Sequence, residues 1–288
     1  MPMLQLLRPH QYTKNLLVFA APGAAGRLDE GDIVIRTTMA FVLFCAASSA
    51  GYVANDVADV EADRAHPKKR HRPIASGAVS RLAANTLIIG LSGFAIGGAL
   101  VLPGRFGAIL VGYMALTFAY SSALKRIPWV ELIAVSAGFL LRAVAGGVAT
   151  STSLSGWFLV VVSAGALLVI TGKRLGEMLT LGSTTPTRQV LARYRVATLR
   201  GLTVAAAALA IAGYATWAVN EAADRSADDS GTLFLQLTIA PFLVAIGRYL
   251  MLSWRGRGEA PDLLVLRDPV VITAGIGWVA LYAIGLYR

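Results

Sequence analysis

Three aspartates near residue 60 have the type and the spacing that can hold a metal ion. Asp56, Asp59 and Asp63 lie at positions i, i+3 and i+7, so on a continuous helix they share one face within about two turns. Clustered carboxylates repel one another unless a cation lies among them. Mg²⁺ takes one or two carboxylates and completes its shell with water and substrate phosphate. The spacing predicts a catalytic metal site beside Asn55, and the alternative is a solvated acidic helix end.

A basic segment, HPKKRHRPIASG, follows the aspartates at 66–77. Pro67 and Pro73 stop a helix, and Gly77 suits a turn, so the segment can fold back over the carboxylates. Lys and Arg bind phosphate oxygens, Arg often in a bidentate manner. The alternative is a loop that touches lipid head groups. Aspartates that hold a metal and basic side chains that bind phosphate oxygens would together bind a diphosphate. The basic residues assigned to this diphosphate are Arg64, Lys68, Arg70 and Arg72.

Most of the further candidate residues lie in two segments after the basic loop. Glu131 and Arg142 are eleven residues apart, about three helical turns, so they share a face. An Arg in mid-span costs on the order of 3 kcal/mol and usually faces the protein interior, so Arg142 is expected to bind an anion or to pair with Glu131. A purely structural pair is the alternative. The remaining residues assigned to substrate binding are Asn55, Lys14, Tyr120 and Lys125, and the membrane-edge cluster Lys173, Arg174 and Glu177.

Apolar segments long enough to cross a bilayer recur along the chain. The sequence is 56% hydrophobic and 15% charged, with a mean hydropathy of +0.64, and a span needs roughly 17–25 residues. We expect an all-α, polytopic membrane helix bundle with about nine transmembrane helices in one domain, 1–288. One span, 15–26, is short and tilts or stops early. The others are 33–54, 83–102, 106–121, 128–149, 156–172, 201–219, 232–253 and 269–287.

Lys and Arg residues place the N-terminus in the cytoplasm. In that orientation nineteen of the 26 Lys and Arg residues lie inside, four lie outside and three lie within spans, the asymmetry typical of cytoplasmic loops. The formal charge of +10 is therefore attributed to membrane orientation, and no nucleic-acid partner is expected. The two long inside loops, 55–82 and 173–200, are expected to carry the active site.

Three features are expected to have no catalytic role. Cys45, the only cysteine, lies in an apolar run and is expected to be a small buried residue. Gly93 and Gly97 form a GxxxG pattern, which usually marks close helix packing. Residues 1–17 lack the basic start and the cleavage site of a secretory signal, so we expect them to be retained.

The aspartate motif and the spans resemble the UbiA-type membrane prenyltransferase superfamily. Its first metal motif, NDxxDxxxD after the second span, matches residues 55–63, and the resemblance covers nearly the whole chain. The usual second Asp-rich motif after the sixth span is missing, and Lys173, Arg174 and Glu177 stand in its place. This departure argues against ordinary prenyl transfer.

Within that superfamily the chain looks most like the phosphoribosyltransferase branch, because of the segments 55–77, YSSALK, FLLRAVAGG and GKRLGE. Phosphoribosyl diphosphate and a polyprenyl phosphate bring several phosphate groups, which favours one metal cluster and additional Lys and Arg. The resemblance implies Mg²⁺-dependent transfer of 5-phosphoribose to a polyprenyl (decaprenyl) phosphate, with release of pyrophosphate, for arabinan cell-wall precursors. It places the protein in the bacterial inner membrane with the active site facing the cytoplasm.

Two alternatives stay open at this point. A prenyltransferase with an aromatic acceptor would need a second DxxxD motif, which the sequence lacks. A lipid-phosphate transporter would need inverted repeats and broken mid-membrane helices, and neither is evident. The sequence leaves open a homo-oligomer, the number of Mg²⁺ ions and the polyprenyl length.

Overall fold

The computed structural model describes residues 2–67, 69–181, 189–223, 230–259, 261, 264 and 267–287. Within these residues there are helices and turns but no strand, which confirms the all-α prediction. By its contacts the chain divides into two compact units. The N-terminal unit comprises Met1–Ala134 and Gly138–Ser153, and the C-terminal unit comprises Val135–Ala137 and Leu154–Arg288. The single domain stays a prediction.

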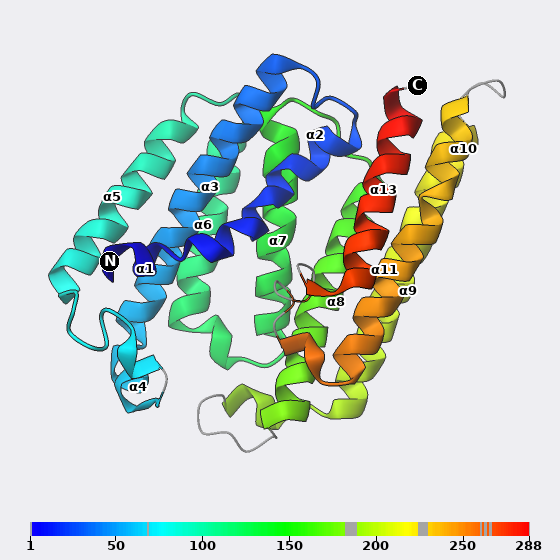
Figure 1. Cartoon of the computed structure of the whole chain (residues 1–288). Coiled ribbons are helices and arrows are strands. Elements are labelled where there is room, and N and C mark those ends of the chain that lie inside the picture. Colours follow the sequence, from blue (N-terminus) through cyan, green and yellow to red (C-terminus); the bar gives the residue numbers. More distant parts are fainter. Residues whose placement is uncertain are drawn as a thin grey trace. The chain divides into compact units, whose positions relative to one another are not determined.

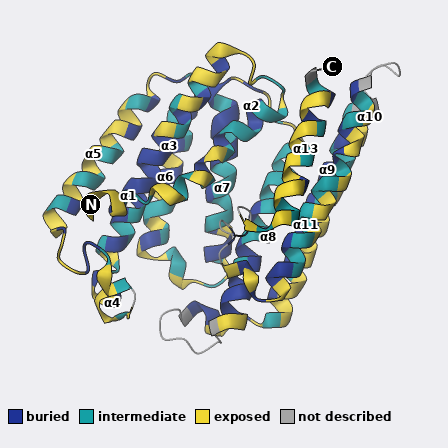
Figure 2. Cartoon of the chain, in the orientation of Figure 1, coloured by how far each residue is buried: buried dark blue, intermediate teal, exposed yellow. Residues whose placement is uncertain are grey.

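Helix α3, Gly31–Ala58, is central to the N-terminal unit. It contacts α5, Arg81–Ala99, and α6, Phe106–Ser122, which flank it in Figure 1. Most of α7, Val130–Ala149, belongs to the same unit. Buried residues follow α3 along much of its length, whereas α5 is largely exposed or half-buried (Figure 2). An apolar helix with one exposed face is what a membrane bundle requires where that face meets lipid.

The core of this unit is aromatic where α3 meets α6. The Phe44 ring lies 5.1 Å from the Tyr113 ring and 6.1 Å from the Phe106 ring, between centroids. Small residues let backbones approach elsewhere: a Cβ at Gly146 of α7 would lie only 1.8 Å from the Val18 carbonyl oxygen. Glycine is therefore required at position 146 for α7 to contact the N-terminal segment.

The N-terminal segment differs from an ordinary transmembrane helix. It comprises α1, Pro2–Leu7, the 3₁₀ helix η1, Pro9–Phe19, and α2, Ala20–Ala24. A 3₁₀ run of this length is uncommon. The expected short span 15–26 therefore consists of 3₁₀ and short α-helical structure, with Asn15 buried within it.

The first long loop, 55–82, is largely ordered by helices. Its first residues lie in α3, and α4, Val60–Ala65, and the 3₁₀ turn η2, Lys69–His71, follow. Ile74 and Val79 are buried in an apolar cluster with residues of α1, α3, α4 and α5. Burying such a side chain stabilises the fold by about 1.5–3 kcal/mol, so this cluster holds the loop against the helices.

The C-terminal unit is also helical. Its α8 and α9 contact each other over much of their length, and α11 contacts both α9 and α13. Pro241 lacks an amide hydrogen and cannot complete a helical bond, which accounts for the break between α10 and α11. The elements are α8, Gly156–Leu181; η4, Gln189–Arg193; α9, Val196–Ala223; α10, Ser230–Leu237; α11, Ile239–Trp254; η5, Arg257–Glu259; and α13, Pro269–Tyr287.

Several helices are longer than the spans expected from hydropathy. Helix α8 continues from the expected end at residue 172 to Leu181, and α9 begins at Val196. Charged side chains do not end a helix that leaves the apolar layer, because the backbone bonds continue in water. The inside loop expected at 173–200 therefore begins and ends with helix, and residues 182–188 lie outside the described part.

Seven helical segments are long and apolar enough to cross a membrane: Gly31–Ala58, Arg81–Ala99, Val130–Ala149, Gly156–Thr180, Val196–Glu221, Gly231–Trp254 and Pro269–Leu286. Helix α6 is apolar but has only 17 residues, about 25 Å, which is a little shorter than the hydrocarbon core. A polytopic membrane bundle is thus confirmed. The count of nine spans and the cytoplasmic N-terminus stay predictions.

Candidate active site

The three aspartates lie where α3 gives way to α4. Helix α3 ends at Ala58, Asp59 is its C-cap with φ −97° and ψ 6°, and α4 begins at the next residue. The expected continuous helix is therefore interrupted at Asp59. Helix α4 ends at Ala65 because Pro67 follows, and the residue before a proline is disfavoured in helical conformation. Asp56 and Asp63 are both 3% exposed.

The basic loop folds back over two of these carboxylates. Nη1 of Arg72 lies 3.0 Å from Oδ1 of Asp56 and 2.8 Å from Oδ2 of Asp63. Arg8, between α1 and η1, adds a second cation, with Nη2 at 2.5 Å from the same Asp56 oxygen. Its guanidinium also lies over the Tyr52 ring at 5.3 Å. Two nearly buried carboxylates thus share one guanidinium, and one of them binds a second.

Asp59 has a different cation. Nζ of Lys125, in the 3₁₀ turn η3, Leu124–Arg126, lies 2.6 Å from Oδ1 of Asp59 and donates to Oδ1 of Asn55 at 3.1 Å. The turn after α6 is therefore tied to the end of α3 by one ammonium group. All four residues of the motif and two of the predicted basic residues, Arg72 and Lys125, come together in the N-terminal unit.

The donors in this cluster suit a hard divalent cation, although cationic side chains stand among them. Asp56 and Asp63 both lie within 3.0 Å of one nitrogen, so a single positive centre can contact both. Mg²⁺ needs only one or two carboxylates. Among the described residues, no group of three His, Cys, Asp or Glu side chains is placed to hold a metal together. The arrangement fits a two-carboxylate site.

Arg142 belongs to a separate buried network within the N-terminal unit. Its Nε donates to Oδ1 of Asn15 at 2.8 Å, its Nη2 to the Tyr113 hydroxyl at 2.7 Å and its Nη1 to the Gly138 carbonyl at 2.8 Å. Asn15 is itself fully buried and donates to Oγ of Ser48. These bonds join η1, α3, α6 and α7, so Arg142 positions helices. The expected pairing of Arg142 with Glu131 is not observed among the described contacts.

The membrane-edge cluster of α8 lies in the C-terminal unit. Arg174 is 1% exposed, and its Nη1 lies 2.6 Å from Oε2 of Glu177 one turn later. A buried charge of this kind requires a paired, hydrogen-bonded partner. Lys173 is half-buried beside it. The structure therefore supports an ion pair at this end of α8, while the assignment of these three residues to the substrate stays a prediction.

No described contact joins Arg64, Arg70 or Lys14 to the three aspartates. Arg64 contacts Glu61 and the Ala75 carbonyl, and Arg70 contacts His71. Nζ of Lys14 donates to the Gln11 side chain. Lys68 lies outside the described residues. Within the N-terminal unit, Tyr120 is half-buried near the end of α6, and Glu131 is fully buried at the start of α7.

Arg8, the cation closest to Asp56, was not among the residues expected at the site. The two residues are 48 positions apart, so no helical spacing links them. The one local signal is the Arg-Pro pair: Arg8 adopts φ 51°, ψ 59°, just before Pro9 starts η1. A positive φ is uncommon for a residue other than glycine, and this turn is tied to α3 by the Arg8–Asp56 ion pair.

Known families match both the sequence and the fold. The model of the UbiA prenyltransferase family matches residues 16–173. A protein of Mycobacterium tuberculosis named decaprenyl-phosphate phosphoribosyltransferase is 36% identical over 96% of this chain and 92% of its own. One of the same name from Corynebacterium glutamicum is 38% identical over 99% of this chain and 86% of its own. The chain therefore belongs to the UbiA prenyltransferase family.

Solved structures agree on the fold. A UbiA homologue from Archaeoglobus fulgidus, bound to DMAPP and Mg²⁺, superposes with a TM-score of 0.71 at 16% identity. The match covers 100% of this chain and 98% of that one. At this identity the likeness establishes the fold alone. The chain is thus a multi-pass membrane protein of the UbiA fold.

Proposed function

We propose that the protein transfers 5-phosphoribose from phosphoribosyl diphosphate to decaprenyl phosphate or a similar polyprenyl phosphate, with release of pyrophosphate. The observation that carries this proposal is the similarity, at 36–38% identity over nearly the whole chain, to proteins named decaprenyl-phosphate phosphoribosyltransferase. Membership of the family supports a transferase. The cluster of acids and bases at the end of α3 supports a diphosphate-bearing donor.

The aspartates are the proposed metal ligands. Asp56 and Asp63 would hold one Mg²⁺, and Asp59 with Asn55 would complete the coordination from the adjacent turn. When bound there, Mg²⁺ neutralises charge on the diphosphate and favours its departure. The neighbouring structures bound to Mg²⁺ support use of a divalent metal in this fold.

The basic side chains are proposed to exchange carboxylate partners for phosphate oxygens. Arg8, Arg72 and Lys125 each contact an aspartate. Guanidinium and ammonium groups form strong hydrogen bonds to phosphate as well as to carboxylate. Held beside the leaving group, they stabilise negative charge that develops as pyrophosphate departs.

The reaction itself requires no proton transfer from the protein. The bond between ribose C1 and the pyrophosphate oxygen breaks, and pyrophosphate leaves with the electron pair. An already ionised oxygen of the lipid phosphate forms the new bond to C1 from the opposite face. Lys173 and Arg174 stay proposed as substrate-binding residues, whereas Arg142 is assigned to positioning because its described contacts are with protein groups.

The membrane setting follows from the acceptor. A polyprenyl chain stays in the bilayer, so a transferase that uses it benefits from a membrane helix bundle. We propose a bacterial inner membrane with the active site facing the cytoplasm, supported by the Lys and Arg asymmetry. The product would serve arabinan cell-wall synthesis.

Purified protein with labelled phosphoribosyl diphosphate, Mg²⁺ and decaprenyl phosphate tests the proposal. We expect labelled lipid to form, and to be lost when a chelator removes the divalent metal. A parallel assay offers an isoprenyl diphosphate and an aromatic acid in place of the two substrates. Absence of labelled lipid together with a prenylated aromatic product would refute the phosphoribosyl assignment.

A further inference from the structure

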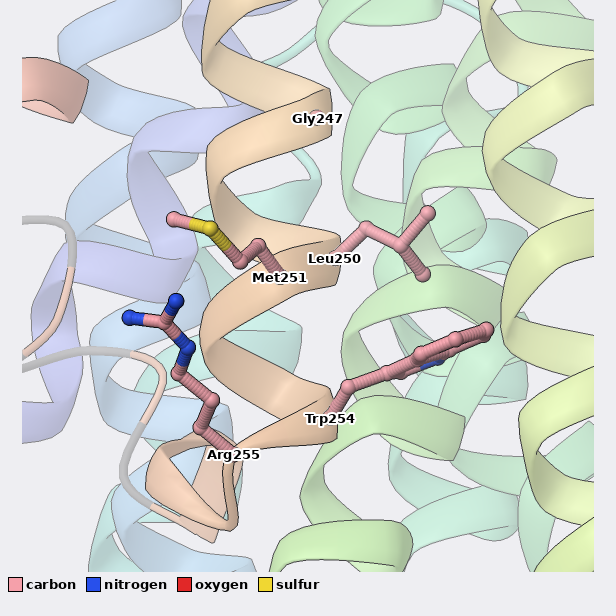
Figure 3. A pocket seen from close by; sticks show the side chains of 5 residues that line it. All are labelled: Gly247, Leu250, Met251, Trp254 and Arg255. Carbon is pink, nitrogen blue, oxygen red and sulfur yellow. The ribbon is translucent and has the colours of Figure 1, made fainter.

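An open groove of about 380 Å³ runs along one face of α11 in the C-terminal unit, lined by Gly247, Leu250, Met251, Trp254 and Arg255. These residues follow the i, i+3, i+4 spacing of a single helix face and extend about 12 Å along its axis. Figure 3 shows Met251 and Arg255 on one side of this face and Leu250 and Trp254 on the other. Gly247 lies above them and has no side chain to fill the space.

The glycine at the apolar end of the groove is not explained by helix packing. A Cβ at Gly247 would meet nothing within 4 Å. At Gly172 of the same unit, by contrast, a Cβ would lie 2.8 Å from the Ser253 hydroxyl oxygen. Since glycine in a helix interior costs about 1 kcal/mol relative to alanine, its presence at 247 is consistent with keeping the groove open for a ligand.

The other end of the groove is cationic. Arg255 is exposed and has no side-chain partner among the residues that the structure describes. Trp254 is 43% exposed, and the Arg200 guanidinium lies over its ring at 5.5 Å from the centroid. Along the groove the side chains change from apolar to an indole and then to a guanidinium. A lipid changes in the same order, from its apolar acyl chain through the interface to its charged phosphate.

We propose that this groove binds one anionic glycerophospholipid of the bilayer. An acyl chain lies over Gly247 between Leu250 and Met251, and the phosphate contacts Arg255. Two nearby arginines favour a lipid with a net negative charge, since basic pockets at membrane surfaces select anionic head groups. The carbonyls at the end of α11 carry partial negative charge, so the Arg255 guanidinium is needed to attract the phosphate.

Quenching of tryptophan fluorescence by brominated acyl chains tests this site. The protein is placed in phosphatidylcholine nanodiscs that contain a small fraction of brominated phosphatidylglycerol or, separately, brominated phosphatidylcholine. Trp254→Phe isolates the contribution of Trp254 from the other four tryptophans. We expect brominated phosphatidylglycerol to quench Trp254 several-fold more effectively than brominated phosphatidylcholine.

Two variants test separately the charge of Arg255 and the open space over Gly247. Arg255→Gln should weaken association of phosphatidylglycerol about fivefold, the effect expected for one arginine at an anionic surface. Gly247→Leu should fill the groove and abolish the preferential quenching. Matched controls are Arg126→Gln, at another exposed arginine, and Gly275→Leu, where a Cβ likewise meets nothing within 4 Å, and both should behave like the parent protein.

Three outcomes would overturn the proposal. One is equal quenching by the two brominated lipids, and another is quenching that neither Arg255→Gln nor Gly247→Leu alters. The third is loss of quenching when decaprenyl phosphate is added at the same mole fraction as phosphatidylglycerol, which would make the groove a site for the acceptor lipid instead.

Discussion

Replacing Arg72 by glutamine should make the stability of the protein depend on a divalent cation. Arg72 is the guanidinium that Asp56 and Asp63 share, at 3.0 and 2.8 Å. In Arg72→Gln, Asp56 keeps Arg8, but Asp63 loses the cation that the described structure gives it. A nearly buried carboxylate without a cation is destabilising, and Mg²⁺ can supply the missing positive charge.

The size of the effect follows from the contacts. A hydrogen bond to a charged group contributes about 1.5–3 kcal/mol, and Arg72 makes two. Its side chain is 28% exposed, so water replaces part of the interaction, and we expect a loss of about 2–3 kcal/mol. For a chain of this size that lowers Tm by about 4–12 °C. Mg²⁺ at ten times its Kd for the folded protein would restore about 1.4 kcal/mol.

The single cysteine provides the assay. Cys45 is buried in α3, so a thiol-reactive fluorophore labels it only when the N-terminal unit opens. Thermal unfolding in detergent is followed by this labelling, with millimolar Mg²⁺ or with chelator. Arg70→Gln is the control, because Arg70 is exposed and contacts only His71 among the described side chains. Its Tm should stay close to that of the parent protein.

Two results would refute this reasoning. The first is an Arg72→Gln protein as stable as the parent in chelator, which would mean that the shared ion pairs contribute nothing. The second is an equal increase in Tm with Mg²⁺ for Arg72→Gln and its parent, which would mean that the metal does not bind at these carboxylates. A double variant with Asp63→Asn should recover part of the lost stability, since it removes the carboxylate left without a cation.

Three further predictions concern catalysis, packing and pH. Asp59→Asn should reduce phosphoribosyl transfer more than about a hundredfold, because even a residue behind a metal ligand costs up to that much; near-normal turnover would exclude it as a ligand. Gly146→Ala should cost about 1–3 kcal/mol by overpacking. Gly97→Ala, where the added Cβ meets nothing within 4 Å, should stabilise the helix by up to about 1 kcal/mol. Both changes are measured by Cys45 labelling on heating, and equal effects would contradict the packing described at position 146. Hydrogen bonds from Arg248 lower the pKa of Asp268 below its ordinary 3.8, so its charged form stabilises the folded protein above that pH and this stabilisation is lost as pH falls. The Tm difference between Asp268→Asn and its parent, followed by tryptophan fluorescence, should therefore be present at neutral pH and close below about pH 3.8; a difference independent of pH would refute the role of this charge.

Local periodicity made much of the fold and part of the site predictable. The spans follow from runs of apolar residues, and the segment 66–77 was expected to fold back because Pro67 and Pro73 interrupt helix formation. The structure adds that Ile74 is buried against α1, α3, α4 and α5, so packing and charge both hold the loop. The spacing also predicted that Asp56 and Asp63 lie close together, but it did not predict that the helix is interrupted at Asp59.

Contacts between distant segments were not predictable from spacing. The GxxxG pattern of Gly93 and Gly97 was expected to mark close packing, yet a Cβ at either position would meet nothing within 4 Å. The close approach occurs at Gly146 against Val18, 128 residues away in the sequence. The partner of Arg142 proved to be Asn15, in a 3₁₀ segment whose geometry hydropathy does not specify.

The charges around the aspartates indicate how the proposed substrates would enter. Asp56, Asp59 and Asp63 are matched by three cations, Arg8, Arg72 and Lys125. A metal ion alone would add positive charge among groups that are already neutralised, so its binding should be weak. A metal that arrives with a diphosphate brings negative charge for the released cations to bind. We therefore expect Mg²⁺ and phosphoribosyl diphosphate to bind cooperatively in the parent protein, and this cooperativity to decrease in Arg72→Gln, where Mg²⁺ no longer competes with a guanidinium.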